Sequence, residues 1–142
     1  MSAILNEGPF CVIIGTARDC ESHLDKCLNQ LRSVADHFSP RTEDVGYLFF
    51  ENDSVDKSAR ILAEFCATDP VRRELLVEQG LVALLPKRTH RLAHARNVLL
   101  RHLTAKGWLE QLEVLIVADC DEVNVSSTAC STTIERTRPR SS

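Results

Sequence analysis

The sequence predicts an α/β protein in which a parallel sheet is flanked by helices. Two observations indicate this fold class. Short apolar runs rich in β-branched residues alternate along the chain with longer stretches whose apolar residues recur every three or four positions. The short runs are apolar at nearly every position, which is typical of strands buried on both faces of a parallel sheet. Strands that alternate with helices form such sheets through right-handed crossovers.

The first part of the chain predicts two strands, each followed by a helix. Residues 10–15 (FCVIIG) form a continuous apolar run and predict the first strand. Helical spacing of apolar residues predicts a helix over residues 21–38, which Pro40 closes. Residues 46–50 (GYLFF) predict the second strand, and an amphipathic helix is expected over residues 55–66.

The middle of the chain predicts two further helices around a third strand. A short helix is expected between Asp69-Pro70 and Gly80, because an aspartate–proline pair suits the start of a helix and glycine suits its end. Residues 81–85 (LVALL) predict the third strand. Apolar residues over 92–103 then mark a helix that ends near Gly107.

The fourth strand is predicted at residues 114–118 (VLIVA), and the chain changes character soon after it. From Val125 onward the sequence lacks an apolar period and is dominated by Ser, Thr and Arg. We therefore expect one α/β domain over residues 10–124 and a disordered tail over residues 125–142.

Composition excludes several classes of protein. The net charge of −3 gives no electrostatic case for binding nucleic acid or an anionic membrane. No apolar run approaches the roughly 18 residues of a membrane span, and the N-terminus lacks the pattern of a signal peptide. The six cysteines contain no C-x-x-C pair, so reduced thiols and a cytoplasmic location are expected.

An acidic pair, Asp119 and Asp121, follows the apolar run at 114–118. Alternate residues of an extended chain point to the same side, so the two carboxylates could hold one hard divalent cation together with diphosphate oxygens. Ligands of parallel α/β sheets gather at this end of the strands. The alternative interpretation is a solvated acidic turn that caps the next helix.

A second polar cluster, residues 50–58 (FENDSVDKS), follows the second predicted strand. Its carboxylates and amide can accept hydrogen bonds from a base or a ribose. Ser54 and Asp56 can equally cap the following helix.

A third pattern, residues 88–100 (RTHRLAHARNVLL), places Arg96 and Asn97 beside the apolar stripe of a helix. An arginine there can reach a base or a phosphate, and the alternative is a basic surface helix. His90 and His94 have the spacing of two zinc ligands, but the glutamate of H-E-x-x-H is absent and no third ligand is indicated.

Together and in this order, these segments resemble the GT-A glycosyltransferases of the family-2-like type. The corresponding stretches read CVIIGTARDC, FFENDSVDKS, LAHARNVLL and VLIVADCDEVN, and they cover residues 10–124. The stretches FENDSVD and RLAHARN are especially similar to the capsule-type α-mannosyltransferase branch. The resemblance implies the nucleotide-binding half of a Rossmann-like GT-A domain.

The resemblance also implies roles for single residues. Thr16 and Ala17 would line the base, Glu51 or Asn52 would bind the base or ribose, and Arg96 would contact the base or the phosphates. Asp119 and Asp121 would hold Mn²⁺ or Mg²⁺ on the diphosphate. The sequence departs from the family at Glu51-Asn52-Asp53, which stands where two acids and a glycine are usual, and in the 23 positions from Arg96 to Asp119.

The function expected from this resemblance is transfer of a hexose from a UDP- or GDP-sugar to a sugar hydroxyl, in the manner of a metal-dependent glycosyltransferase. The acceptor-binding half is expected after the acidic pair, where only 21 residues follow Asp121. A fragment with little transferase activity of its own is therefore expected, and no catalytic residue is assigned. Two alternatives remain: a nucleotidyltransferase that forms sugar nucleotides, and an inactive truncated nucleotide-binding domain.

Overall fold

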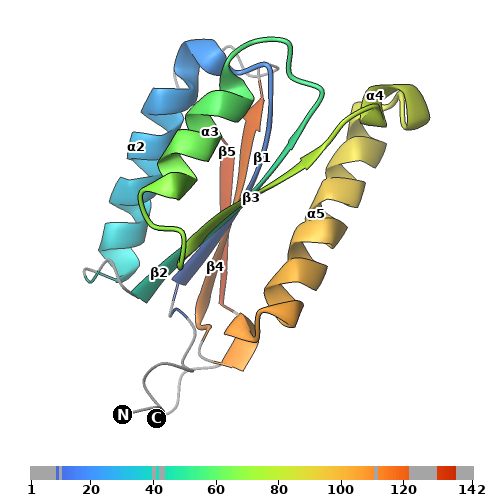
Figure 1. Cartoon of the computed structure of the whole chain (residues 1–142). Helices are drawn as coiled ribbons and strands as arrows, with labels where there is room; N and C mark the ends of the chain where they lie inside the picture. The colour runs from blue at the N-terminus through green and yellow to red at the C-terminus, as the bar shows by residue number, and fades with distance from the viewer. Residues whose placement is uncertain are drawn as a thin grey trace.

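Five strands form one sheet in the order β3-β2-β1-β4-β5, in a computed structural model of the chain (Figure 1). The structure describes residues 9, 11–39, 41, 44–110, 112–121 and 131–136, with the backbone alone at residues 121 and 131–136. The first four strands in this order are parallel, and β5 is antiparallel to β4. The strands are β1 (Cys11–Arg18), β2 (Val45–Asn52), β3 (Arg73–Glu78), β4 (Val114–Asp121) and β5 (Ser131–Arg136).

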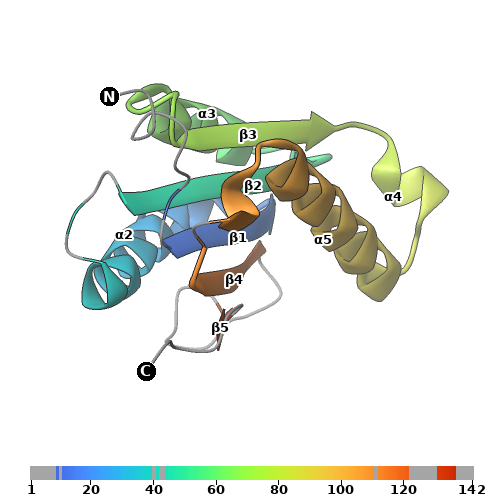
Figure 2. The same cartoon turned by 90° about the horizontal axis from the view of Figure 1, so that it is seen from below.

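Helices cover both faces of this sheet, which confirms the predicted α/β class (Figure 2). One face carries α2 (Glu21–Phe38) and α3 (Ser58–Ala67), and the other carries α5 (Arg88–Ala105). A short helix, α4 (Leu81–Leu84), precedes α5, and the 3₁₀ helix η2 (Trp108–Glu110) follows it. Within the described ranges, no helix has both the length and the apolar character needed to cross a bilayer.

The order of the strands creates a switch point between β1 and β4. The chain runs from β1 outward through β2 to β3, and then returns through α4 and α5 to place β4 on the other side of β1. Crossovers on either side of β1 therefore lie on opposite faces of the sheet. In open α/β sheets the carboxyl ends of the strands at such a point form a crevice that binds ligands.

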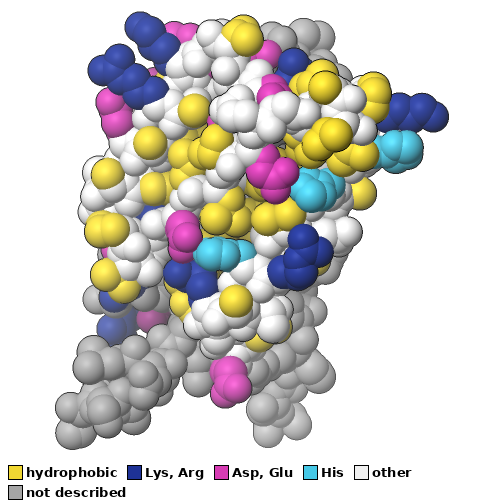
Figure 3. Space-filling model, turned by 45° about the vertical axis from the view of Figure 1, so that its right-hand side comes forward, with side chains coloured by type: hydrophobic (Ala, Val, Ile, Leu, Met, Phe, Trp, Pro, Cys, Tyr) yellow, Lys and Arg dark blue, Asp and Glu magenta, His cyan; other side chains and the backbone are white. Residues whose placement is uncertain are grey.

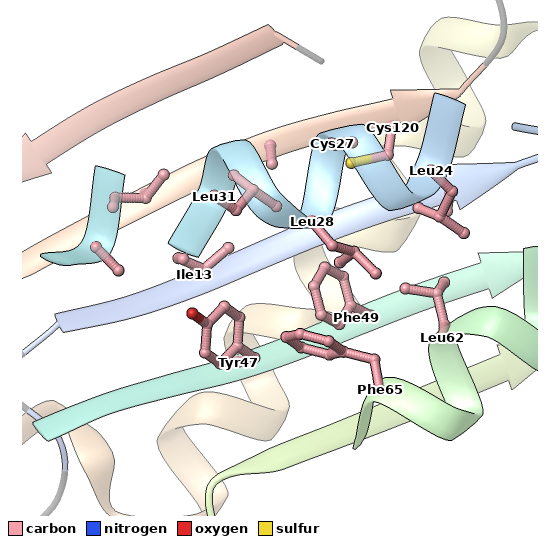
Figure 4. Packing of buried hydrophobic residues seen from close by; sticks show 14 of the residues in the cluster. Ile13, Leu24, Cys27, Leu28, Leu31, Tyr47, Phe49, Leu62, Phe65 and Cys120 are labelled. Carbon is pink, nitrogen blue, oxygen red and sulfur yellow. The ribbon is translucent and has the colours of Figure 1, made fainter. Parts of the chain in front are cut away.

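The face under α2 and α3 has an aromatic core (Figure 4). Phe65 of α3 meets Tyr47 and Phe49 of β2 edge-to-face, with ring centroids 5.1 and 5.8 Å away. Gly15 of β1 makes room for this packing, since a Cβ at that position would lie 2.8 Å from the Phe49 ring. Because Gly15 has no side chain, the Phe49 ring can pack directly against β1.

The face under α5 has an aliphatic core. Three residues of α5, Ala95, Leu99 and Leu103, are buried against apolar residues of β1 and β2. Trp108 extends this cluster and packs on Gly46, where a Cβ would lie 2.6 Å from the indole.

Most of the predicted elements are confirmed, and two neighbouring predictions are wrong. The predicted strands at residues 10–15, 46–50 and 114–118 lie within or overlap β1, β2 and β4. The segment LVALL at 81–85, predicted as the third strand, contains α4 instead, and the helix predicted just before it is replaced by β3. A short apolar run fits either a strand or a helix, and Leu84 is 77% exposed, so this run is not a buried strand.

The C-terminal prediction is wrong for one segment. Residues 131–136, expected to lie in a disordered tail, form β5, which pairs from Val114↔Arg136 to Asp119↔Ser131. Residues 122–130 and 137–142 lie outside the described part of the chain. The sequence of β5, STTIER, contains three consecutive β-branched residues, which favour an extended chain beside an available edge.

The cysteines that the structure describes, Cys11, Cys20, Cys27, Cys66 and Cys120, are all buried. Burial raises the pKa of Cys11 and of Cys66 to about 11, so these two thiols remain protonated at neutral pH.

Candidate functional site

Three polar side chains meet where β1, β2 and β4 end on the α5 face. Side chains alternate along a strand, and Thr16, Asn52 and Asp119 continue the set of residues that face α5. Thr16 and Asp119 are direct neighbours in the register of β1 and β4. The Thr16 hydroxyl donates a hydrogen bond of 2.6 Å to Asp119 Oδ1.

Two arginines of α5 reach the same carboxylate. Arg96 Nη2 lies 3.4 Å from Asp119 Oδ2, and Arg88 Nη2 lies 3.7 Å from it. The side chain of Asp119 is 18% exposed, whereas those of Arg88 and Arg96 are 37% and 43% exposed. Asp119 is therefore a mostly buried anion, with one oxygen bound by Thr16 and the other facing two guanidinium groups.

A small pocket of about 20 Å³ opens beside this carboxylate. Its lining comes from the end of β1, the end of β2 and the first turns of α5: Thr16, Ala17, Arg18, Asn52, Arg88, Arg91, Leu92 and Ala95. That volume admits about one water molecule.

The structure separates the two candidates for base or ribose recognition. Asn52 faces α5 and lines the pocket, while Glu51 lies on the α2/α3 face and is fully buried. Glu51 Oε2 accepts a hydrogen bond of 2.8 Å from the Ser54 backbone N–H. Its Oε1 is buried and has no hydrogen-bond partner among the described residues. Only Asn52 therefore shares the pocket with the arginines.

Asp53 caps the short helix α4. Its carboxylate accepts hydrogen bonds from the backbone N–H groups of Gly80 (2.6 Å) and Val82 (2.9 Å), and from Asn52 Nδ2 (2.9 Å). The bond from Asn52 is the main reason that the pKa of Asp53 is lowered, and the backbone bonds lower it further. Asp53 has a φ of 55°, a conformation that only a minority of non-glycine residues adopt.

Asp56 joins the N-termini of α2 and α3. Its two oxygens accept hydrogen bonds from the backbone N–H groups of Glu21 (3.0 Å) and Ser58 (2.9 Å). Burial raises the pKa of Asp56, but the bonds from Ser58 and Glu21 outweigh it and leave that pKa lowered. A parallel bond runs from the Val55 N–H to Asp19 Oδ1 at 2.7 Å. Capping, the alternative kept for this segment, therefore accounts for Asp56.

The expected cation site does not fit the described residues as they lie. The side chain of Asp121 lies outside the described part; its backbone pairs with Arg18. In the described ranges, no group of three or more His, Cys, Asp or Glu residues could hold a metal ion. Unit charges 4 Å apart interact by about 4 kcal/mol at an effective dielectric constant of about 20. A divalent cation on Asp119 Oδ2 would face a repulsion of that order from each guanidinium.

Three arginines of the site were not singled out from the sequence: Arg18, Arg88 and Arg91. Arg91 is fixed by bonds from Nη1 to the carbonyl oxygens of Leu85 (2.9 Å) and Pro86 (2.7 Å). The signal that could have found two of them is the basic run KRTHR at 87–91, just before the helix bearing Arg96. Of the two histidines with the spacing of zinc ligands, His94 pairs with Glu78, since its Nε2 lies 3.1 Å from Glu78 Oε1.

No protein-family model matches the sequence, and no curated protein matches it at a significant level. The fold and the site define an α/β protein with a cationic cluster at the switch point of its sheet. Function is therefore inferred from the residues that meet there.

Proposed function

We propose that this chain is the nucleotide-sugar-binding part of a glycosyltransferase that uses a UDP- or GDP-hexose. The observation that carries the proposal is the meeting of Thr16, Asn52, Arg96 and Asp119 at the switch point. These residues come from four different segments, and the resemblance assigns all four to one ligand. A nucleoside diphosphate is an extended anion with a polar base, so it needs both amide and guanidinium partners.

Each residue has a distinct task in this proposal. The base and ribose lie over Thr16, Ala17 and Asn52, where the Asn52 amide can both donate and accept hydrogen bonds. The diphosphate lies toward Arg96, whose planar group binds phosphate oxygens in pairs. Glu51 takes no part in binding, because it is buried on the other face of the sheet.

The resemblance also assigns Mn²⁺ or Mg²⁺ to Asp119 and Asp121. Because Asp119 as it lies does not fit a cation, no step of the proposal depends on the metal. The proposal concerns the donor; the acceptor, a carbohydrate hydroxyl, has no assigned residues.

The test is calorimetry of the full chain with UDP, GDP, UDP-hexoses and GDP-hexoses, each with and without Mn²⁺. We expect at least one nucleoside diphosphate to bind and the free nucleoside to bind more weakly. Asn52→Ala should weaken binding about five- to tenfold, since a hydrogen bond to a ligand contributes about 1 kcal/mol. The matched control is Asn29→Ala, an exposed asparagine of α2. Absence of nucleotide binding under every condition would refute the proposal.

A further inference from the structure

We infer that Arg88 and Arg96 bind the diphosphate directly, and that Asp119 is the anchor that positions these arginines rather than a ligand of a metal ion. The inference rests on the proposed function, since it names how that site takes its ligand. It predicts that a diphosphate binds without a divalent cation.

The first support is the way in which Asp119 is held. Its Oδ1 accepts the 2.6 Å hydrogen bond from Thr16 on the adjacent strand, which fixes the carboxylate against β1. Its Oδ2 faces Arg96 at 3.4 Å and Arg88 at 3.7 Å. A carboxylate fixed in this way and mostly buried can orient guanidinium groups, because it supplies the counter-charge that they need to lie side by side.

The second support is that two arginines of the site have a buried N–H donor without a hydrogen-bond partner among the described residues. Arg96 uses Nη2 on Asp119, and its Nε is buried without a hydrogen-bond partner among the described residues. Arg18 also lines the pocket, and its Nε is likewise buried without a hydrogen-bond partner among the described residues. Buried donors without acceptors are uncommon in proteins. Both point to a ligand that brings several acceptor oxygens.

The third support is the balance of charge around the pocket. Arg18, Arg88 and Arg91 line it and Arg96 lies beside it, in a chain whose net charge is −3. Asp119 lies beside Arg88 and Arg96, and Asp19 lies 3.8 Å from Arg18. Four guanidinium groups around one pocket favour an anion with more than one charge.

A diphosphate fits this arrangement better than a carboxylate ligand does. It carries several oxygens on two adjacent phosphorus atoms, so that two guanidinium groups held by one carboxylate can each bind a separate phosphate. Arg88 and Arg96 are 37% and 43% exposed, so their outer edges can turn toward a ligand while Asp119 stays in place.

The experiment is calorimetry of the full chain with inorganic pyrophosphate, UDP and GDP, first in EDTA and then with Mn²⁺. We expect pyrophosphate and the better nucleotide to bind in EDTA, with less than about a threefold gain from Mn²⁺. Arg96→Gln and Arg88→Gln should each weaken pyrophosphate binding about tenfold, which corresponds to about 1.4 kcal/mol. Arg96→Lys should restore only part of the affinity, because an ammonium cannot bind two oxygens in a plane.

The matched control is Arg101→Gln, an exposed arginine of the same helix, which should leave pyrophosphate affinity unchanged. Circular dichroism and thermal unfolding of each variant identify any loss of fold. Thr16→Val tests the anchor, because it frees Asp119 Oδ1 without touching an arginine; it should weaken pyrophosphate binding severalfold. A cation site predicts instead that Arg96→Gln leaves Mn²⁺-dependent affinity equal or higher.

The outcomes separate the two proposals. Binding of nucleotides only when Mn²⁺ is present overturns the inference and leaves the proposed function standing. Binding of pyrophosphate in EDTA, lost in both arginine variants, supports the inference even if neither UDP nor GDP binds, in which case the proposed function fails. Absence of binding by every probe overturns both.

Discussion

At the carboxyl ends of β1 and β2, the two faces of the sheet carry different polar groups. On the α2/α3 face, the loops after β1 and β2 bind each other through backbone hydrogen bonds to Asp19 and Asp56. On the α5 face, the same two strands end in Thr16 and Asn52 beside a cluster of arginines. The α2/α3 face keeps a buried acceptor without a partner, Glu51 Oε1, whereas the buried donors without partners on the α5 face include the Nε atoms of Arg18 and Arg96, among the described residues.

This difference shows what a helix layer contributes. On the α2/α3 face, the N-termini of two helices lie side by side, and each has backbone N–H groups without partners inside its helix. The carboxylates of the connecting loops accept hydrogen bonds from these groups. Before α5, Asp53 caps the short helix α4, and the arginine side chains of α5 lie beside the ends of β1 and β2. Residues of similar chemistry therefore serve the fold on one face and form a candidate site on the other.

The largest expected effect comes from breaking the core of each face in turn. Phe49→Ala should lower the free energy of unfolding by about 3–5 kcal/mol, because a fully buried ring packed on Gly15 and Phe65 is lost. Leu99→Ala, the matched change under α5, should cost about 2–5 kcal/mol and less than Phe49→Ala. Urea unfolding measures both. A larger cost for Leu99→Ala would mean that the α5 face is the better packed of the two.

The second prediction concerns the hydrogen bond that fixes Asp119. Thr16→Val keeps the shape of a side chain that is 6% exposed but removes the donor to Asp119 Oδ1. We expect a loss of about 1–3 kcal/mol in stability, since a mostly buried carboxylate oxygen loses its partner. Thr16→Ser keeps the hydroxyl and should recover most of this loss. Equal stability of the valine variant would show that the two arginines alone satisfy the carboxylate.

The strands and long helices could be predicted from the sequence because each buried position selects an apolar residue. The spacing of those apolar residues then reveals the type of element. The choice between Glu51 and Asn52 could not, because β2 is buried at every position. Apolar residues on both faces conceal which of two neighbouring side chains faces α5. The error at 81–85 has a similar origin, since five apolar residues carry no period that separates strand from helix.

The sequence identified residues of the candidate site but not the contacts between them. Arg96 was predicted to contact the base or the phosphates and Asp119 to hold the metal ion on the diphosphate, and the two residues lie 3.4 Å apart although 23 positions separate them. Their mutual contact was not foreseen, because an ion pair between two elements depends on the crossing of α5 over the sheet. The pattern of a strand followed by acids does not distinguish a metal ligand from a partner for arginine.

The third prediction breaks the closed end of the α2/α3 face. Asp56→Ala should cost about 1–2 kcal/mol, because it removes the acceptor of two helix N-termini at once. Asp56→Asn keeps one acceptor oxygen and should cost less. Because the pKa of Asp56 is lowered from 3.8 in the folded protein, its stabilisation is present above that value and is lost as the pH falls through the folded pKa. Urea titrations between pH 7 and pH 2 should show the wild type losing this advantage over Asp56→Ala.

The smallest expected effect comes from the ion pairs that tie α5 to the edge strand β3, on the face shown in Figure 3. Glu74 Oε2 lies 3.0 Å from His102 Nε2, and Glu74 Oε1 accepts a hydrogen bond of 3.1 Å from Lys106 Nζ. Partial burial opposes ionisation of Glu74, but these two partners outweigh it and hold its pKa below the ordinary 4.5.

Glu74→Gln should therefore lower stability by less than about 1 kcal/mol, since Glu74 is 38% exposed and its ion pairs are screened by solvent. The difference from wild type should shrink in high salt, and it should disappear below pH 4.5 as the pH falls through the folded pKa of Glu74. The control is Glu64→Gln on α3, whose pair with Arg60 is 67% exposed at the glutamate and joins residues of one helix. We expect that variant to match wild type. If both variants lose the same stability in parallel urea titrations, the ties between α5 and β3 stabilise the fold no more than an exposed pair within one helix.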